Sequence, residues 1–100
     1  MKINTTLTLM ENKVWRLEGA LTFLTVNHVL KQSQKLWHDV SHLTIDFSAV
    51  DVTDSAALAL MVEWQREAKK QYKKIRFLNL PKQLKKLTQI SALDDILNVN

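Results

Sequence analysis

The chain has 100 residues, of which 46% are hydrophobic, and its formal net charge is +4. This length is typical of one domain and is sufficient for a hydrophobic core, so we expect a single domain over residues 1–100. Cysteine is absent, which excludes disulfides, thiolate metal sites and cysteine nucleophiles.

The sequence also lacks the usual signals for export or membrane insertion. The first residues, MKINTTLTLMENKVW, contain no apolar run of the kind found in a signal peptide. The longest apolar run, AALALMV, is too short to cross a bilayer. We therefore expect a soluble, cytoplasmic protein.

The N-terminal segment predicts a β-hairpin. Residues Asn4 to Met10 alternate in polarity and are rich in β-formers, and Val14 to Glu18 forms a second such run after the turn ENK. Gly19 is the only glycine of the chain, and we expect it to end the second strand.

The remaining elements alternate between helical and extended patterns. TVNHVLKQSQKLW has the apolar spacing of a helix, with Thr25 as its expected N-cap. HLTIDFSAV predicts a strand, Ser55 to Gln71 a helix, and KKIRFLNL a fourth strand. Pro81 suits the first turn of a further helix, and SALDDIL predicts a short final one.

The predicted order is therefore β-β-α-β-α-β-α-α. Helices that connect successive strands imply parallel pairs, whereas the leading hairpin adds an antiparallel pair. We expect a small α/β fold, with a mixed sheet of four strands and the helices packed mainly on one face.

The positive charge is local. Such a bias can favour nucleic acid, an anionic membrane or an acidic partner. The simpler interpretation is solvated helix faces and a strand edge protected by lysines. We expect no aromatic residues that interleave with these charges as single-strand binders require, and therefore no nucleic-acid binding. Residues 66–86 contain one acid, Glu67, and nine basic residues, namely Arg66, Lys69, Lys70, Lys73, Lys74, Arg76, Lys82, Lys85 and Lys86.

The stretch VTDSAALAL, at the predicted junction of the third strand and second helix, carries the most specific pattern. Ser55 does not stand in the G-x-S-x-G turn of a hydrolase nucleophile, and no adjacent imidazole could serve as its base. One glycine cannot build a phosphate-binding loop. The histidines at 28, 38 and 42 lack the spacing of metal ligands. We therefore expect no catalytic residue, no metal and no cofactor.

Helix capping explains part of this stretch. Either Asp54 or Ser55 can accept hydrogen bonds from the free N–H groups of the first helical turn. Capping does not explain AALAL, because its small and apolar residues lie nearly all round the helix. Such a helix is either buried on several sides or presents a smooth face to a partner. We expect Trp37 and Trp64 to belong to the core.

The segment LTIDFSAVDVTDSAALALMVEWQREAKKQYKKIRFLNLPKQLKKLTQISALDDIL resembles a STAS domain, a family named for sulfate transporters and anti-sigma-factor antagonists. The resemblance covers nearly the whole chain. Its most specific part is a strand carrying Asp46, followed by D-S before a helix, which is close to the family pattern D-[ST]-[SA]-G-L. The resemblance implies the fold of the anti-sigma-factor antagonists.

The resemblance also bears on phosphorylation. Antagonists of this family accept phosphate on the second hydroxyl of a D-S-S-G motif, and that position is Ala56 here. Ser55 matches the first hydroxyl, and Ala57 replaces the glycine. The usual acceptor is therefore missing. Ser55 is a candidate substitute acceptor, although we expect it rather to cap the helix and face a partner.

Small STAS proteins without the acceptor resemble the STAS subunit of the Mla phospholipid-transport ABC system, which maintains outer-membrane lipid asymmetry in Gram-negative bacteria. The resemblance implies a non-enzymatic regulatory and assembly subunit that binds the cytoplasmic ATPase and, through it, the permease. Its association with the cytoplasmic side of the inner membrane would be indirect. The alternative is an anti-sigma-factor antagonist or a similar partner-switching regulator controlled by phosphorylation. The sequence leaves open whether isolated chains form a weak homodimer.

The predicted docking surface combines the loop before the second helix, the first turns of that helix, and the loop after the second strand. A third interpretation, lipid or nucleotide binding by the domain itself, depends on the basic segment alone. The residues of the predicted docking surface are Val52, Thr53, Asp54 and Ser55, then Ala56, Ala57, Ala59, Leu60 and Glu63, and finally Leu21, Thr22, Phe23 and Leu24.

Overall fold

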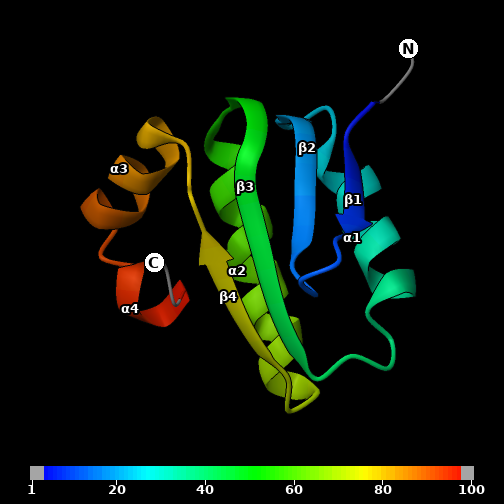
Figure 1. Ribbon diagram of the computed structural model, residues 1–100. Coiled ribbons are helices and arrows are strands. Elements are labelled where there is room, and N and C mark those ends of the chain that lie inside the picture. Colours follow the sequence, from blue (N-terminus) through cyan, green and yellow to red (C-terminus); the bar gives the residue numbers. More distant parts are fainter. Residues whose placement is uncertain (1–3, 98–100) are drawn as a thin grey trace.

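The computed structural model describes residues 4–97, which form four strands and four helices (Figure 1). All eight predicted elements are present in the predicted order. In chain order they are β1 (Thr6–Leu9), β2 (Trp15–Leu21), α1 (Val26–Leu36), β3 (His42–Thr53), α2 (Ser55–Lys70), β4 (Lys74–Leu78), α3 (Lys82–Ile90) and α4 (Asp94–Leu97).

The four strands form one mixed sheet in the order β1-β2-β3-β4. The hairpin of β1 and β2 is antiparallel, and β3 pairs in parallel with both β2 and β4. Ile45 stands at the centre, level with Trp15 on one side and Phe77 on the other. The mixed sheet predicted from the order of elements is confirmed.

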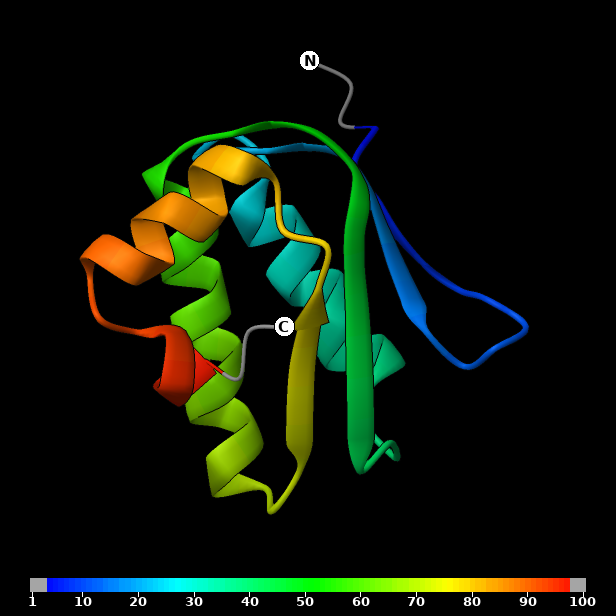
Figure 2. The ribbon, with the colours of Figure 1, turned by 60° about the vertical axis from the view of Figure 1, so that its left-hand side comes forward.

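The core lies between this sheet and the helices on one of its faces (Figure 2). Along β3, Leu43, Ile45 and Phe47 are buried, whereas Thr44 and Asp46 between them are only half-buried. This alternation is typical of a sheet with one covered face. None of the helices within residues 4–97 is both long and apolar enough to cross a membrane.

A chain of aromatic rings fills the core. The ring of Trp37 lies 5.9 Å from that of Trp15 and 5.1 Å from that of Trp64, which in turn stacks on Phe77. The indole Nε1 of Trp64 donates a hydrogen bond to the buried hydroxyl of Ser33. The prediction that Trp37 and Trp64 belong to the core is confirmed.

The expectation that Gly19 ends the second strand is wrong, because β2 continues to Leu21. The parallel register with β3 shifts between Gly19 and Ala20, and Gly19 has a φ of 105°. A Cβ atom at this position would lie 3.2 Å from the Cα of Thr5. Glycine is therefore required for both the backbone conformation and the close approach of a neighbouring segment.

The predicted starts of two helices can be compared with the structure. Thr25 is the N-cap residue of α1, as predicted, although its hydroxyl does not bond to the helix; it accepts a hydrogen bond from the Thr22 N–H and donates one to the Ala20 carbonyl. Pro81 was expected in the first turn of α3 but precedes it at its N-cap, so that the first helical residue is Lys82.

Candidate functional site

The side chain of Asp54 joins two segments that are distant in sequence. Asp54 is the N-cap of α2, and its Oδ1 accepts a hydrogen bond of 2.8 Å from the Ala56 N–H. Its Oδ2 accepts a bond of 3.1 Å from the N–H of Phe23, in the loop between β2 and α1. One carboxylate therefore caps α2 and also fixes the β2–α1 loop beside it.

Ser55 is not the helix cap, contrary to the expectation from the sequence. It is the first residue of α2, and its side chain is exposed. Among the described residues, none forms a hydrogen bond with its hydroxyl group. Asp54 takes the capping role because its backbone is extended, with a φ of −138° and a ψ of −171°, which directs its carboxylate at the free N–H of Ala56.

The structure brings the two predicted docking segments together at one end of the sheet. Leu21, the last residue of β2, lies level with Thr53, the last residue of β3. The chain then turns through residues 22–25, where Thr25 holds the loop by its bond from the Thr22 N–H. Val52 and Thr53 are therefore the end of a strand and not part of a loop as expected.

Three residues of the predicted docking surface are not available to a partner. Leu21 and Ala57 are fully buried, and Leu60 is 4% exposed. They pack in the core beneath the surface, because α2 turns that side of its first turns towards the sheet. Those that are exposed are Phe23 at 71%, Leu24 at 53%, Val52 at 55%, Ser55 and Ala59, and the half-buried ones are Thr22, Thr53, Asp54, Ala56 and Glu63.

A shallow groove of about 210 Å³ runs between α1 and α2 at this end. Its α2 side comprises Ala56, Ala59, Leu60 and Glu63, all predicted from the sequence. The α1 side was not among the residues predicted for the docking surface, although the helical spacing of its apolar residues already indicated a face turned towards another element. Those α1 residues are Val26, Asn27 and Leu30.

A second hollow, of about 320 Å³, lies on the other side of the β3 end. Val52 and Thr53 line it together with Pro81, Lys82 and Gln83 from the start of α3. No sequence signal connected α3 with this site, because the contact depends on where the sheet places the β4–α3 connection. The exposed Val52 side chain is thus bordered by the start of α3.

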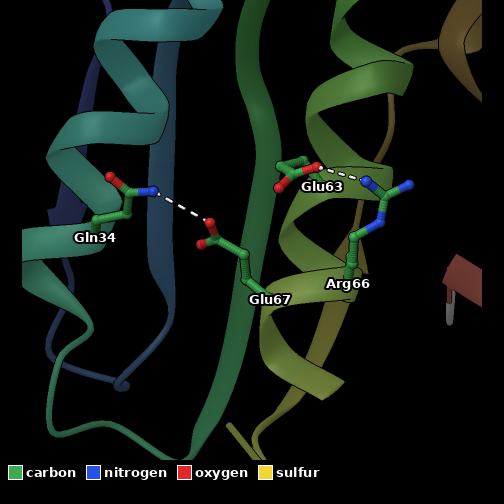
Figure 3. Close-up of polar contacts among 4 residues, drawn as sticks. All are labelled: Gln34, Glu63, Arg66 and Glu67. Atoms are coloured by element: carbon green, nitrogen blue, oxygen red, sulfur yellow. Dashed lines mark hydrogen bonds and ion pairs between the residues drawn. The ribbon is translucent and has the colours of Figure 1, made fainter. Parts of the chain in front are cut away.

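Glu63 is the charged residue among the described residues that line the groove, and it forms an ion pair of 3.4 Å with Arg66 one turn later (Figure 3). A second acid, Asp54, lies at the N-cap of the same helix and accepts the two backbone N–H bonds described above. Figure 3 also shows the Gln34 amide donating to Glu67, 3.2 Å away, which links α1 to α2 further along.

The accessible residues around the start of α2 form one surface, which we name the N-terminal docking surface. It comprises Phe23, Leu24, Val52, Asp54, Ser55, Ala56, Ala59 and Glu63.

Asp46, the acid of the family-like strand, has a structural role outside this surface. Its carboxylate accepts hydrogen bonds from the Asn79 side chain at 3.0 Å and from the Ser48 N–H at 2.9 Å. Partial burial raises the pKa of Asp46, but these hydrogen bonds outweigh it, so the pKa lies below its ordinary value. Because Asn79 follows β4, the interaction holds the β4–α3 connection against β3.

The described residues contain no group of three His, Asp or Glu side chains arranged to hold a metal ion.

The family model described as "Mlab, STAS domain" matches residues 8–98. The chain is a member of the STAS-domain family. No curated protein sequence matches it.

Solved structures share the fold of this STAS domain. The anti-sigma factor antagonist SpoIIAA in its unphosphorylated form has a TM-score of 0.65 at 19% identity, covering 92% of this chain and 96% of that one. The Bacillus cell fate determinant SpoIIAA in its phosphorylated form gives 0.69 at 21%, covering 91% and 86%. A candidate anti-sigma factor antagonist of Thermotoga maritima gives 0.77 at 14%, covering 95% and 84%. At these identities the similarity establishes the fold alone.

Proposed function

We propose that this STAS domain is a non-catalytic regulatory and assembly subunit that binds the cytoplasmic ATPase of an Mla-type phospholipid-transport ABC complex. The observation that carries the proposal is the N-terminal docking surface, where Phe23, Leu24 and Val52 expose apolar side chains around the Asp54 junction. Clustered exposed apolar side chains are typical of protein–protein contact. The match to a family model named for MlaB supports this choice of complex.

The chemistry of the surface fits close contact with another protein. The alanines at 56 and 59 leave no bulky side chain above the groove, so a partner could approach the backbone of α2 closely. Phe23 is an exposed aromatic side chain in the β2–α1 loop beside Asp54 and would serve as an anchor in a partner's pocket. The helix N-terminus would favour a carboxylate or carbonyl group of the partner.

The test is purification of the tagged protein from detergent-solubilised membranes of its own organism, with partners identified by mass spectrometry. We expect an ABC-type ATPase together with its permease. Ser55→Arg places a long cation in the centre of the N-terminal docking surface and should abolish the complex. Its matched control is Ser91→Arg, at the exposed C-terminal cap of α3, which should bind as the original chain does. A Ser55→Arg variant that retains the ATPase would place the interface elsewhere.

The second candidate is an anti-sigma-factor antagonist or related partner-switching regulator. It is favoured by the exposed hydroxyl of Ser55 at the first residue of α2, where a phosphate group would meet free backbone N–H groups. The distinguishing experiment is incubation with a cognate kinase and ATP, followed by mass spectrometry. A phosphate on Ser55 that is absent from Ser55→Ala, together with recovery of a soluble kinase, would support this function over the transporter one.

A further inference from the structure

The end of the molecule opposite the N-terminal docking surface has a contrasting chemistry. The sequence KKQYKK, residues 69–74, connects α2 to β4 at the bottom of Figure 1. Lys69, Lys70 and Lys74 are exposed. Tyr72 lies between them with 94% of its surface exposed. We name these four residues the basic tip. The expectation that no aromatic residue interleaves with the basic charges is therefore wrong, because Tyr72 stands between Lys70 and Lys73.

Tyr72 has no packing role that explains its presence. Its side chain is almost entirely in solvent, and its backbone has a φ of 57°. This left-handed conformation suits glycine or asparagine and is unfavourable for a bulky residue. An aromatic ring that contributes nothing to the core, at a position where its backbone is disfavoured, points to a role in contact with something outside the chain.

The lysines of this segment fall into two groups. The Lys73 ammonium donates to the carbonyls of Trp37 and His38 at the end of α1, so it is part of the fold. Within residues 4–97, the ammonium groups of the other three lysines form no ion pair. Two acids lie on the elements next to these lysines. Glu67, on α2, accepts a hydrogen bond from Gln34, and Asp39, in the segment before β3, is exposed.

Ordinary structural reasons account for some of these charges. Lys69 and Lys70 complement the C-terminal end of the α2 dipole. Lys74 protects β4, which is an edge strand of the sheet. Neither reason requires an exposed tyrosine in their midst, and it is the combination that resembles a membrane-contacting surface.

We propose that the basic tip binds the headgroup region of an anionic lipid surface. Lysines near such a surface are attracted by its negative potential, and the long lysine stems and a tyrosine ring can lie at the boundary between apolar and polar regions. A single aromatic ring does not provide the succession of stacking platforms that single-stranded nucleic acid requires. The inference goes beyond the proposed function and does not depend on it, because it concerns a different surface and lipid alone.

The geometry allows both surfaces to be used together. α2 has 16 residues, and a helix of this length spans about 24 Å. The N-terminal docking surface is at its start and the basic tip at its end (Figure 1). The two surfaces therefore share no residue and lie at opposite ends of the helix.

The test is sedimentation of the purified chain with vesicles of phosphatidylcholine alone or with about a quarter phosphatidylglycerol, an anionic lipid. We expect binding to the anionic vesicles only, weakened by salt. The triple variant Lys69→Gln/Lys70→Gln/Lys74→Gln should bind about a hundredfold more weakly, since each lysine contributes about fivefold. Its matched control, Lys82→Gln/Lys85→Gln/Lys86→Gln, removes the same charge from exposed positions of α3 and should bind as the original chain does.

A second variant separates contact from charge. Tyr72→Asn removes the ring and suits the left-handed backbone, so we expect weaker vesicle binding with unchanged or higher thermal stability. The proposal would be overturned if neutral vesicles bound equally well, if the α3 triple variant lost as much affinity as the tip variant, or if Tyr72→Asn bound like the original chain. It would also be overturned if a single-stranded RNA, added at the same concentration of negative charges as the anionic lipid, displaced the chain completely from the vesicles.

Discussion

The two ends of α2 share one helix but differ in chemistry. At its start, the side chains facing solvent are small or hydroxyl-bearing, and the neighbouring exposed residues are apolar. At its end, the exposed side chains are three lysines, Gln71 and Tyr72. Between the ends, the buried side of α2 packs on the sheet through Ala57, Leu60, Met61, Trp64 and Ala68. The core thus determines the middle of the helix, and its ends are free to carry different surfaces.

The two ends are also fastened to α1 in complementary ways. Asp54, at the start of α2, accepts from the Phe23 N–H in the loop before α1. Lys73, just after α2, donates to the Trp37 and His38 carbonyls at the end of α1. A negative group therefore lies at the positive end of the two helices and a positive group at their negative end, as the helix dipoles favour.

The largest effect we predict comes from giving the start of α2 the positive charge that its end carries. Ala59→Lys adds an exposed cation to the groove between α1 and α2, and lysine is a good helix former. We expect affinity for the ATPase to fall about thirtyfold or more, equivalent to a loss of at least about 2 kcal/mol. Gln71→Lys adds the same charge at the other end of α2 and should leave the affinity unchanged. Titration against the co-purified ATPase measures both; equal affinities for the two variants would contradict the proposed interface.

The second prediction concerns the fastening at the start of α2. Asp54→Ala removes the cap of α2 and the bond to Phe23, so we expect the free energy of unfolding to fall by about 2 kcal/mol. Asp54→Asn keeps an acceptor oxygen for the Ala56 N–H and should lose less than half as much. Urea denaturation at neutral pH measures both variants. An unchanged midpoint for Asp54→Ala would show that the two loops are held by other contacts.

The third prediction compares lysines within residues 69–74. Lys73→Met keeps an apolar stem but removes the hydrogen bonds to the end of α1, so we expect a loss of about 1 kcal/mol in the free energy of unfolding. Lys70→Met removes an exposed charge and should change it by less than about 0.5 kcal/mol. Thermal or urea unfolding distinguishes the two, and equal effects would refute the structural role of Lys73.

The smallest effect we predict lies outside both ends, at Asp46. Because its pKa is lowered by folding, its stabilising contribution is present above its unfolded pKa of about 3.9 and is lost as the pH falls through the lower folded value. Asp46→Asn removes this contribution. The difference in unfolding free energy between the original chain and this variant should therefore shrink as the pH is lowered from neutral to below about 4. Urea denaturation at several pH values checks this, and a constant difference would contradict it.

The sequence predicted the order and type of the elements because the period of apolar residues differs clearly between strands and helices. It failed where that period is weak. Gly19 was expected to end the second strand. Instead, its missing side chain allows β2 to run close to the backbone of Thr5 and continue to Leu21. β3 extends through Val52 and Thr53, whose side chains do not alternate between core and solvent.

The candidate site was predictable in position but not in detail. The D-S pair located it, but both residues carry acceptor oxygens, so only the backbone conformation identifies Asp54 as the cap. Because AALAL is small or apolar all round, the sequence could not fix which side of the helix faces the sheet, and Ala57 and Leu60 prove to be buried. The spacing of apolar residues predicts that α1 packs one face on another element, but which element it meets depends on packing between distant segments, which no local pattern encodes.

The most direct measurement uses the exposed aromatic residue at each end of α2. A photo-cross-linking phenylalanine analogue replaces either Phe23 or Tyr72, which are 71% and 94% exposed, and cells are irradiated before the products are identified. The account predicts a cross-link from position 23 to an ABC-type ATPase and none to that protein from position 72. A cross-link to the ATPase from position 72 alone, or to a soluble kinase from position 23, would contradict it.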